Sequence, residues 1–191
     1  MTENKILMKQ AREALTGKWK LAIGVSAVYM LINIIMGSLK DFGSFLSLFI
    51  SGPLAMGMSI FALSITRNKE ARFEQLFEGF KRYGRSLAAY LLIALFTILW
   101  MLLLIIPGII AAISYSQTFF ILANDETVGA KEAINRSKKI MYGNKWRYFC
   151  LQLRFIGWGI LSILTLGIGF LWLVPYTQVT MAKFFEEINI K

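Results

Sequence analysis

Histidine is absent from this chain of 191 residues, and cysteine occurs once, as Cys150. These scarcities exclude a disulfide within the chain and a metal site built from histidine or from several cysteines. Charged residues are also few, because 17% of the chain is Asp, Glu, Lys or Arg, whereas about 25% is usual in soluble domains. The composition therefore argues against an ordinary soluble domain.

Sequence signatures of common catalytic sites are lacking too. The chain has no nucleophile elbow, no glycine-rich phosphate loop and no pair of carboxylates within an apolar segment. Glu70, Glu74 and Glu78 share one face of a predicted helix, but the Lys and Arg residues nearby favour a solvated, charge-balanced face. We therefore expect no enzymatic activity and no cofactor.

Long uncharged stretches are what the chain does contain. Leu21–Leu39, Phe42–Thr66 and Ser86–Asn124 carry no charge, and Tyr148–Ala182 carries only Arg154. A helix needs about 20 apolar residues to cross a hydrocarbon layer about 30 Å thick. These lengths predict an all-α integral membrane protein.

Two of the stretches are too long for one crossing. Pro107-Gly108 divides the third into Leu87–Ile106 and Ile109–Ala123, because proline and glycine interrupt helices. The sequence Leu166-Gly167-Ile168-Gly169 divides the fourth in the same way. The pattern therefore predicts six transmembrane helices that form three hairpins within one polytopic membrane domain, residues 1–191.

Basic residues predict the orientation of these helices. Of the 21 Lys and Arg residues, 19 fall before the first span, between spans two and three, between spans four and five, or at the end of the sixth. Lys40 lies on the opposite side, and Arg154 lies within a span. The positive-inside rule places the 19 in the cytoplasm together with both termini. Basic residues in this arrangement also argue against nucleic-acid binding, despite a net charge of +10.

Each hairpin is preceded by a segment with helical apolar periodicity, typical of an amphipathic helix in the membrane interface. Each segment ends in a glycine close to basic and aromatic residues. The second helix of each hairpin has a proline at or near its start, Pro53, Pro107 or Pro175, although Pro53 and Pro175 could instead kink a longer helix. We interpret this as one unit used three times, over residues 1–66, 67–124 and 125–191. The periodic residues are Leu7, Ala11, Ala14 and Leu15; Phe73, Leu76, Phe77 and Phe80; and Ala130, Ala133, Ile134, Ser137, Ile140 and Met141.

Polar residues within the apolar stretches form a candidate intramembrane site. They could line a shared cleft that binds a ligand, or they could simply make hydrogen bonds between helices, as polar residues in membrane helices often do. Arg154 could bind a lipid headgroup, or its long side chain could extend back to the cytoplasmic surface. The candidate residues are Asn33, Ser114, Tyr115, Ser116, Gln117, Arg154 and Gln178.

Basic residues near the helix ends form a second candidate site, a surface that contacts anionic phospholipid. Trp19, Trp146 and Trp172 fit an aromatic belt at the membrane interface, and Trp158 is expected to face lipid or the core. The candidate basic residues are Lys18, Lys20, Lys81, Arg82, Arg85, Lys138, Lys139, Lys145 and Arg147. Residues expected to shape the backbone are Pro53, Pro107, Gly108, Gly143, Trp146 and Pro175.

Several clusters along the chain resemble a family of bacterial integral membrane proteins, domain-of-unknown-function family nine-seventy-five. The resemblance rests on Ala14-Leu15 with Gly17 and Trp19, Leu104 to Ile109, Gly143-Asn144-Lys145-Trp146, Gly157-Trp158 and Pro175-Tyr176. It extends from about Lys9 to Phe185, and it implies a helical membrane fold in a low-GC Gram-positive bacterium. The family also looks distantly similar to membrane domains attached to glycerophosphodiester phosphodiesterases. Arg154 departs from its pattern, where a small polar residue is usual.

These observations favour a non-enzymatic accessory protein of the bacterial cytoplasmic membrane. We expect it to engage the lipid bilayer, anionic phospholipid, and either a membrane-protein partner or a second copy of itself. The organism type that the resemblance implies suggests a role in envelope homeostasis or in resistance to membrane-active peptides. The alternative is a small transporter or lipid-handling protein whose pathway is lined by Ser114–Thr118 and Asn33.

Overall fold

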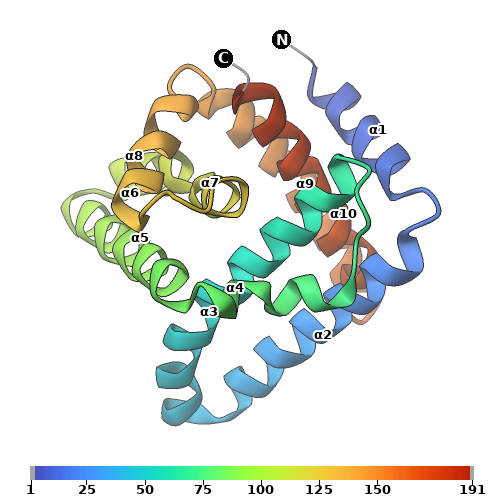
Figure 1. Ribbon diagram of the computed structural model, residues 1–191, viewed down its shortest axis with the longest axis horizontal. Helices are drawn as coiled ribbons and strands as arrows, with labels where there is room; N and C mark the ends of the chain where they lie inside the picture. The colour runs from blue at the N-terminus through green and yellow to red at the C-terminus, as the bar shows by residue number, and fades with distance from the viewer. Residues whose placement is uncertain (1–2, 190–191) are drawn as a thin grey trace.

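A computed structural model describes residues 3–189, without the side chains of residues 40–42, 44 and 45. The described residues form helices joined by short turns and contain no strand, so the prediction of an all-α protein is confirmed (Figure 1). The helices are α1 (Asn4–Leu15), α2 (Trp19–Ser38), α3 (Lys40–Thr66), the 3₁₀ helix η1 (Phe73–Phe77), α4 (Glu78–Lys81), α5 (Tyr83–Leu103), α6 (Ile105–Tyr115), α7 (Thr118–Asn124), α8 (Ala130–Met141), α9 (Lys145–Leu164) and α10 (Phe170–Asn189).

Four segments within these helices are long and apolar enough to cross a membrane: Trp19–Ser38, Leu46–Thr66, Tyr83–Leu103 and Ile105–Asn124. The fourth joins α6 and α7. In the described chain, α9 and α10 are not among them, because α9 carries Arg147 and Arg154 and the end of α10 carries several charges. Four crossing helices are thus supported by length and composition, whereas six crossings remain a prediction.

Consecutive helices pair side by side: α2 with α3, α5 with α6, and α9 with α10. Each pair is preceded in the chain by one or two short helices, and the contacts of these short helices join the pairs into a ring. η1 and α4 contact α3 of the pair that precedes them, α8 contacts α6 and α7, and α1 contacts α10 at the other end of the chain. The contact between α1 and α10 closes the ring, and Figure 1 shows these two helices beside each other on the right.

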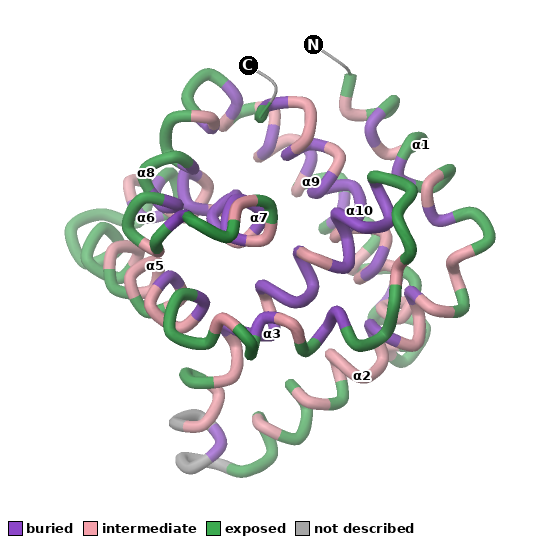
Figure 2. Tube along the Cα trace, viewed as in Figure 1, coloured by how far each residue is buried: buried purple, intermediate pink, exposed green. Residues whose placement is uncertain are grey.

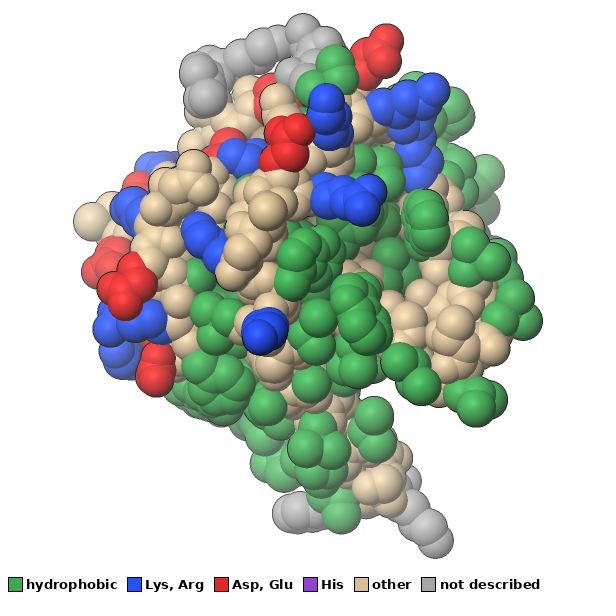
Figure 3. All heavy atoms as spheres, turned by 90° about the vertical axis from the view of Figure 1, so that its right-hand side faces the viewer, with side chains coloured by type: hydrophobic (Ala, Val, Ile, Leu, Met, Phe, Trp, Pro, Cys, Tyr) green, Lys and Arg blue, Asp and Glu red, His purple; other side chains and the backbone are tan. Residues whose placement is uncertain are grey.

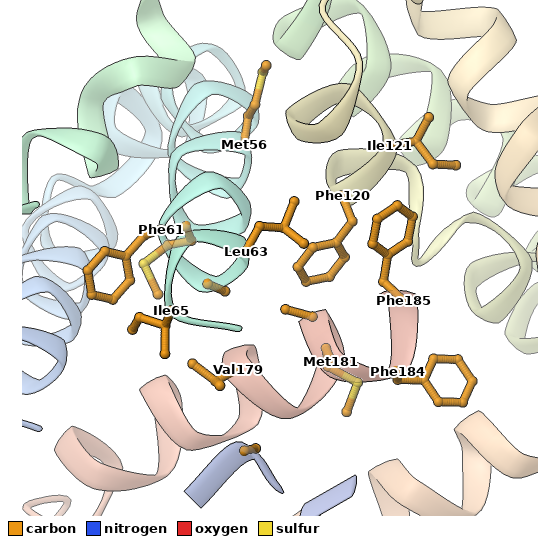
Figure 4. Packing of buried hydrophobic residues seen from close by; sticks show 14 of the residues in the cluster. Met56, Phe61, Leu63, Ile65, Phe120, Ile121, Val179, Met181, Phe184 and Phe185 are labelled. Atoms are coloured by element: carbon orange, nitrogen blue, oxygen red, sulfur yellow. The ribbon is translucent and has the colours of Figure 1, made fainter. Parts of the chain in front are cut away.

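The buried core lies where α3, α7 and α10 meet. Figure 4 shows Met56, Phe61, Leu63 and Ile65 of α3 beside residues of the other two helices. The rings of Phe120 and Phe185 stack with their centroids 5.7 Å apart, so they join α7 directly to α10. The other labelled core residues are Ile121 of α7 and Val179, Met181 and Phe184 of α10.

The far ends of the helix pairs are apolar and exposed. Leu102 at the end of α5 is 84% exposed, and Leu166 in the turn between α9 and α10 is 95% exposed. The distal parts of α2 and α5 are likewise mostly exposed or intermediate in Figure 2. Soluble monomers rarely expose contiguous apolar surface on this scale, which is consistent with a protein that lies in a membrane.

The predicted break at Pro107-Gly108 is displaced toward the N-terminus. The backbone is extended at Leu104, and α6 begins at Ile105. Pro107 therefore lies in the first turn of α6, where its missing N–H costs no helical hydrogen bond. Gly108 has a separate role, because an added Cβ would collide with Met101 of α5. The close approach of α5 and α6 requires a glycine at this position.

Pro53 and Pro175 both lie inside helices, α3 and α10. The prediction that a proline stands at or near the start of the second helix therefore fails for Pro53, and Pro175 falls after the first turn of α10. The alternative of prolines within longer helices is correct. α3 changes direction along its length in Figure 1, as expected for a helix that contains a proline.

The segment predicted as a helix from Phe73, Leu76, Phe77 and Phe80 is helical, first as η1 and then as α4. Leu76 is buried, whereas the three phenylalanines are exposed. The backbone of this segment closely approaches α3, because a Cβ on Gly57 would overlap the carbonyl oxygen of Leu76. The side of the segment that packs on α3 is therefore not the side with the phenylalanines.

The other two periodic segments are regular helices. α1 buries Leu7, Ala11 and Leu15, and α8 buries Ala133, Ile134, Ser137 and Met141. Both helices end in the same turn: Thr16 and Tyr142 have φ near −60° and ψ near 128°, and the glycines that follow have φ of 79° and 77°. These are type II turns, which require glycine at the third position. Gly84 has no positive φ and does not repeat this turn.

Candidate functional site

Charged and polar side chains meet at the ends of several helices to form one polar layer. Arg67 at the end of α3 pairs with Glu186 of α10 at 3.0 Å, and it donates to the side chain of Asn124 at the end of α7. Lys183 donates to the Thr66 carbonyl oxygen at 2.8 Å. The C-terminal ends of α3, α7 and α10 therefore lie at one level of the molecule.

Helix N-termini join the same layer. Arg147 at the start of α9 pairs with Glu187 at 2.7 Å, and Asn4 of α1 donates to the Arg147 carbonyl oxygen at 3.1 Å. Arg82 before α5 pairs with Glu126 and donates to the Leu122 carbonyl oxygen at 3.3 Å. The start of α5 thus lies beside the end of α7.

Four of the nine basic residues predicted to contact lipid contact other groups of the protein. Arg82 and Arg147 form ion pairs, and Arg85 donates to the Glu126 carbonyl oxygen. Lys138 lies over the rings of Phe96 and Tyr115, 5.9 and 5.4 Å from their centroids. The others have no ion-pair partner among the described carboxylates: Lys18, Lys20, Lys81, Lys139 and Lys145.

The loop between α7 and α8 is fixed by Asp125. The hydroxyl and backbone N–H of Thr127 donate to its carboxylate, and Arg136 of α8 lies 3.1 Å away. These hydrogen bonds, with Arg136 assisting, hold the pKa of Asp125 below its ordinary value. The pKa of Arg136 is raised by its hydrogen bonds to Glu132 and Asp125. The cluster keeps α8 docked beside the polar layer.

The polar run Ser114–Thr118 coincides with a break between α6 and α7. At this break the Ser137 hydroxyl of α8 donates to the Ser114 carbonyl oxygen at 2.7 Å and accepts from the Gln117 N–H at 3.2 Å. A buried backbone needs such partners wherever a helix is interrupted within a membrane. The sequence predicts Ser137 only on the apolar face of its helix, and this role was not predicted.

Side chains from α9 extend the polar group. Gln117 donates to the Ser116 hydroxyl at 3.0 Å, and the phenol of Tyr148 lies close to Ser116. Gln152 in turn donates to the Tyr148 hydroxyl at 2.9 Å. Gln117 is fully buried, and its carbonyl oxygen, Oε1, has no hydrogen-bond partner among the described groups. Oε1 of Gln117 is therefore a buried hydrogen-bond acceptor at the break without a donor among the described groups.

The remaining predicted polar residues do not join this group. Asn33 is exposed and donates to the carbonyl oxygen of Tyr29 in its own helix, and α2 chiefly contacts η1, α3 and α10. Arg154 is exposed on α9, and Gln178 is half-buried on α10. The structure thus brings together Ser114, Ser116 and Gln117 and leaves Asn33 apart from them. Tyr115 packs on Phe96, with 6.3 Å between ring centroids.

A cavity of about 600 Å³, widely open to the surface, lies between α1 and α2 on one side and α9 and α10 on the other. Figure 3 shows the molecule from this side, with hydrophobic side chains gathered over the lower right. The lining is mostly aromatic and aliphatic, and Arg12 is its charged member. The lining residues are Arg12, Trp19, Trp158, Leu161, Ser162, Thr165, Gly169, Trp172, Leu173 and Tyr176.

The cavity was not predicted, although the faces of α9 and α10 that line it have a recognisable spacing in the sequence. Trp158, Leu161, Ser162 and Thr165 recur at i, i+3, i+4 and i+7, which places them on one helix face. The cavity residues from Gly169 to Tyr176 repeat the same spacing. Nothing in the sequence shows that Arg12 lies opposite these two faces. In the described part of the chain, no three His, Cys, Asp or Glu side chains are grouped so as to hold a metal ion.

Comparison with known proteins gives a family. A family model described as "Protein of unknown function (DUF975)" matches residues 1–114 and 101–191, which together span the whole chain. The chain belongs to this family, as its Pro-Gly and Gly-Asn-Lys-Trp clusters predicted. No curated protein and no solved structure matches the chain.

Proposed function

We propose that this chain is a non-enzymatic accessory protein of the bacterial cytoplasmic membrane that engages anionic phospholipid through its basic surface. Six helices cross the membrane as three hairpins, and both termini lie in the cytoplasm. A membrane-protein partner or a second copy of the chain binds alongside the lipid. The protein serves envelope homeostasis or protection against membrane-active peptides.

The polar layer supports this topology. Ends of α1, α3, α5, α7, α9 and α10 that the positive-inside rule assigns to the cytoplasm are tied to one another by ion pairs and hydrogen bonds. The opposite ends of these helix pairs are apolar and exposed. Hydrocarbon would cover the apolar ends, while the polar layer would face the headgroups and the cytoplasm.

The unpaired lysines are the observation that carries the proposal. Six predicted lipid-contacting lysines, Lys138 among them, lack a carboxylate partner among the described residues, and they flank apolar helices. Each basic residue close to an anionic membrane surface contributes about 1 kcal/mol to binding.

The test is the composition of the lipid that the protein retains. We would extract it in polymer nanodiscs from vesicles of mixed phosphatidylglycerol and phosphatidylcholine and measure the enrichment of phosphatidylglycerol by mass spectrometry. Enrichment should fall from the parent to Lys138→Gln/Lys139→Gln and again to Lys138→Glu/Lys139→Glu. The matched variant Lys138→Arg/Lys139→Arg keeps the charge and should keep the enrichment. Equal enrichment across the series would refute the proposal.

The break between α6 and α7 favours a second candidate function, transport or lipid handling. Interrupted helices with exposed backbone groups line the substrate sites of many transporters, and the buried Gln117 carbonyl oxygen lacks a donor among the described groups. In that case Gln117→Leu should abolish function while leaving folded protein in the membrane. If the basic surface matters more, the Lys138→Glu/Lys139→Glu variant should be the damaging one.

A further inference from the structure

We propose that the cavity between α1–α2 and α9–α10 binds a single anionic phospholipid, with its phosphodiester at Arg12 and an acyl chain along the apolar wall. This inference rests on the proposed engagement of anionic lipid and gives it a site. The volume of about 600 Å³ falls within the range of roughly 300–1,000 Å³ that is typical of small-molecule sites. The cavity can therefore hold part of one lipid.

The packing of the short helices explains why a cavity exists here. η1 contacts both α2 and α3 of the preceding helix pair, and α8 contacts both α5 and α6. α1 packs on α10 in the corresponding position, and at its start Asn4 donates to the Arg147 carbonyl oxygen at the start of α9. Further along α1, the Tyr176 hydroxyl donates to the Met8 carbonyl oxygen at 3.1 Å, so this part of α1 is held to α10. The face of α9 that contains Trp158 and Leu161 is consequently not covered by α1, and it lines the cavity.

Charge and hydrogen-bonding capacity select the ligand. The Arg12 guanidinium has no ion pair or hydrogen bond with any group of residues 3–189. Trp19, Trp158 and Trp172 donate no indole hydrogen bond to a described acceptor. The hydroxyls of Ser162 and Thr165 already donate to backbone carbonyl oxygens, at 2.9 and 2.8 Å. An occupant that fits must therefore bring a negative charge and hydrogen-bond acceptors to an otherwise apolar wall.

A phosphodiester on an acyl chain has this chemistry. Its two unprotonated oxygens accept hydrogen bonds from a guanidinium in a charge-assisted pair, and the chain can lie against Leu161, Leu173 and the indole rings. About 10 Å separates the levels of Gly169 and Tyr176 along α10, at 1.5 Å per residue. The cavity thus extends along the helices in the direction in which the acyl chains of a bilayer run.

The experiment uses the cavity tryptophans as reporters. Phe replaces Trp100 and Trp146, which leaves the three tryptophans of the lining. The protein is reconstituted in phosphatidylcholine bilayers with a rising fraction of phosphatidylglycerol whose acyl chains are brominated, and fluorescence quenching is recorded. Brominated phosphatidylcholine is the reference lipid. Phosphatidylglycerol should quench at about a fivefold lower mole fraction, the factor expected from one basic residue at an anionic headgroup.

Variants then assign the preference to Arg12. Arg12→Gln should remove it and Arg12→Lys should retain it, while Arg154→Gln, an exposed arginine of α9 outside the lining, should leave it unchanged. Circular dichroism checks that helix content is equal in all of them. Equal quenching by both lipids in the parent, or an unchanged preference in Arg12→Gln, would overturn the site.

Other occupants would give other results. Relief of quenching by millimolar glycerol 3-phosphate would show that a free phosphate ester occupies the site, and a co-purified apolar peptide that blocks quenching would show a protein occupant; either overturns the lipid assignment. The proposed function fails separately. If the lysine series leaves lipid enrichment constant while the Arg12-dependent quenching persists, the site stands and the basic surface does not.

Discussion

Substitution of Gly57 by alanine should destabilise the protein, because the glycine lets two backbones touch. A Cβ at Gly57 would overlap the carbonyl oxygen of Leu76, and one at Gly79 would overlap that of Pro53. These oxygens belong to backbone held by α3 and η1, so no side chain can move aside. Overpacking of this kind costs about 1–3 kcal/mol. Alanine recovers up to about 1 kcal/mol of helix propensity, and we expect a net loss of about 1–2 kcal/mol.

The measurement is thermal unfolding in detergent, followed by the loss of helical circular dichroism. Gly24 is the matched control, since it lies within α2 and an added Cβ there meets nothing within 4 Å. Gly24→Ala should therefore be neutral or stabilising. If Gly57→Ala unfolds at the same temperature as Gly24→Ala, the close contact between α3 and η1 does not exist and the packing described above is wrong.

Three further predictions concern local features. Ser137→Ala should cost about 1–3 kcal/mol, because it leaves two buried backbone groups at the α6–α7 break without a partner; denaturant titration of the variant beside Ser137→Thr checks this. Gly143→Ala should lower the free energy of unfolding by about 1–2 kcal/mol, because φ is 77° at this position. Gly84 has no positive φ, so Gly84→Ala is the control and should not lower it. Thermal unfolding of the two variants checks this. The lowered pKa of Asp125 means that its stabilising contribution is present above its ordinary value of 3.8 and is lost as the pH falls through the lower folded value. The parent and Asp125→Asn should therefore differ in unfolding temperature near neutral pH and converge once the pH has fallen below the lowered folded pKa of Asp125.

Much of the helix pattern could be predicted from the sequence, because membrane helices must satisfy two simple constraints. The apolar runs at Leu21–Leu39 and Phe42–Thr66 correspond closely to α2 and α3, since length and lack of charge suffice to define such helices. The break near Pro107 was harder to place. A proline is compatible both with the end of one helix and with the first turn of the next. Only the folded structure shows that the break lies at Leu104.

Tertiary contacts explain what could not be predicted. The period of Phe73, Phe77 and Phe80 predicts an apolar face, but not that Gly57 and Gly79 bring another side of the segment against α3 and leave this face exposed. Similarly, Ser114–Thr118 was visible as a polar run, but its main partner, Ser137, lies 23 residues from Ser114 in sequence. No local pattern links the two positions.

The three junctions of the ring are unequal, and this inequality is informative. At one junction Gly57 and Gly79 bring backbones into contact, and at the second Ser137 enters the α6–α7 break. Both junctions are thereby filled by the chain itself. The third joins α1 to α10, the first described helix to the last, and retains the cavity that contains Arg12. α1 and α8 end in the same type II turn, so a different turn does not account for the space. The difference is that a cavity, and not a packed short helix, lies beside Trp158 and Leu161 of α9. Arg12, a cation without an ion pair, lines this cavity, which is consistent with an anionic lipid bound there.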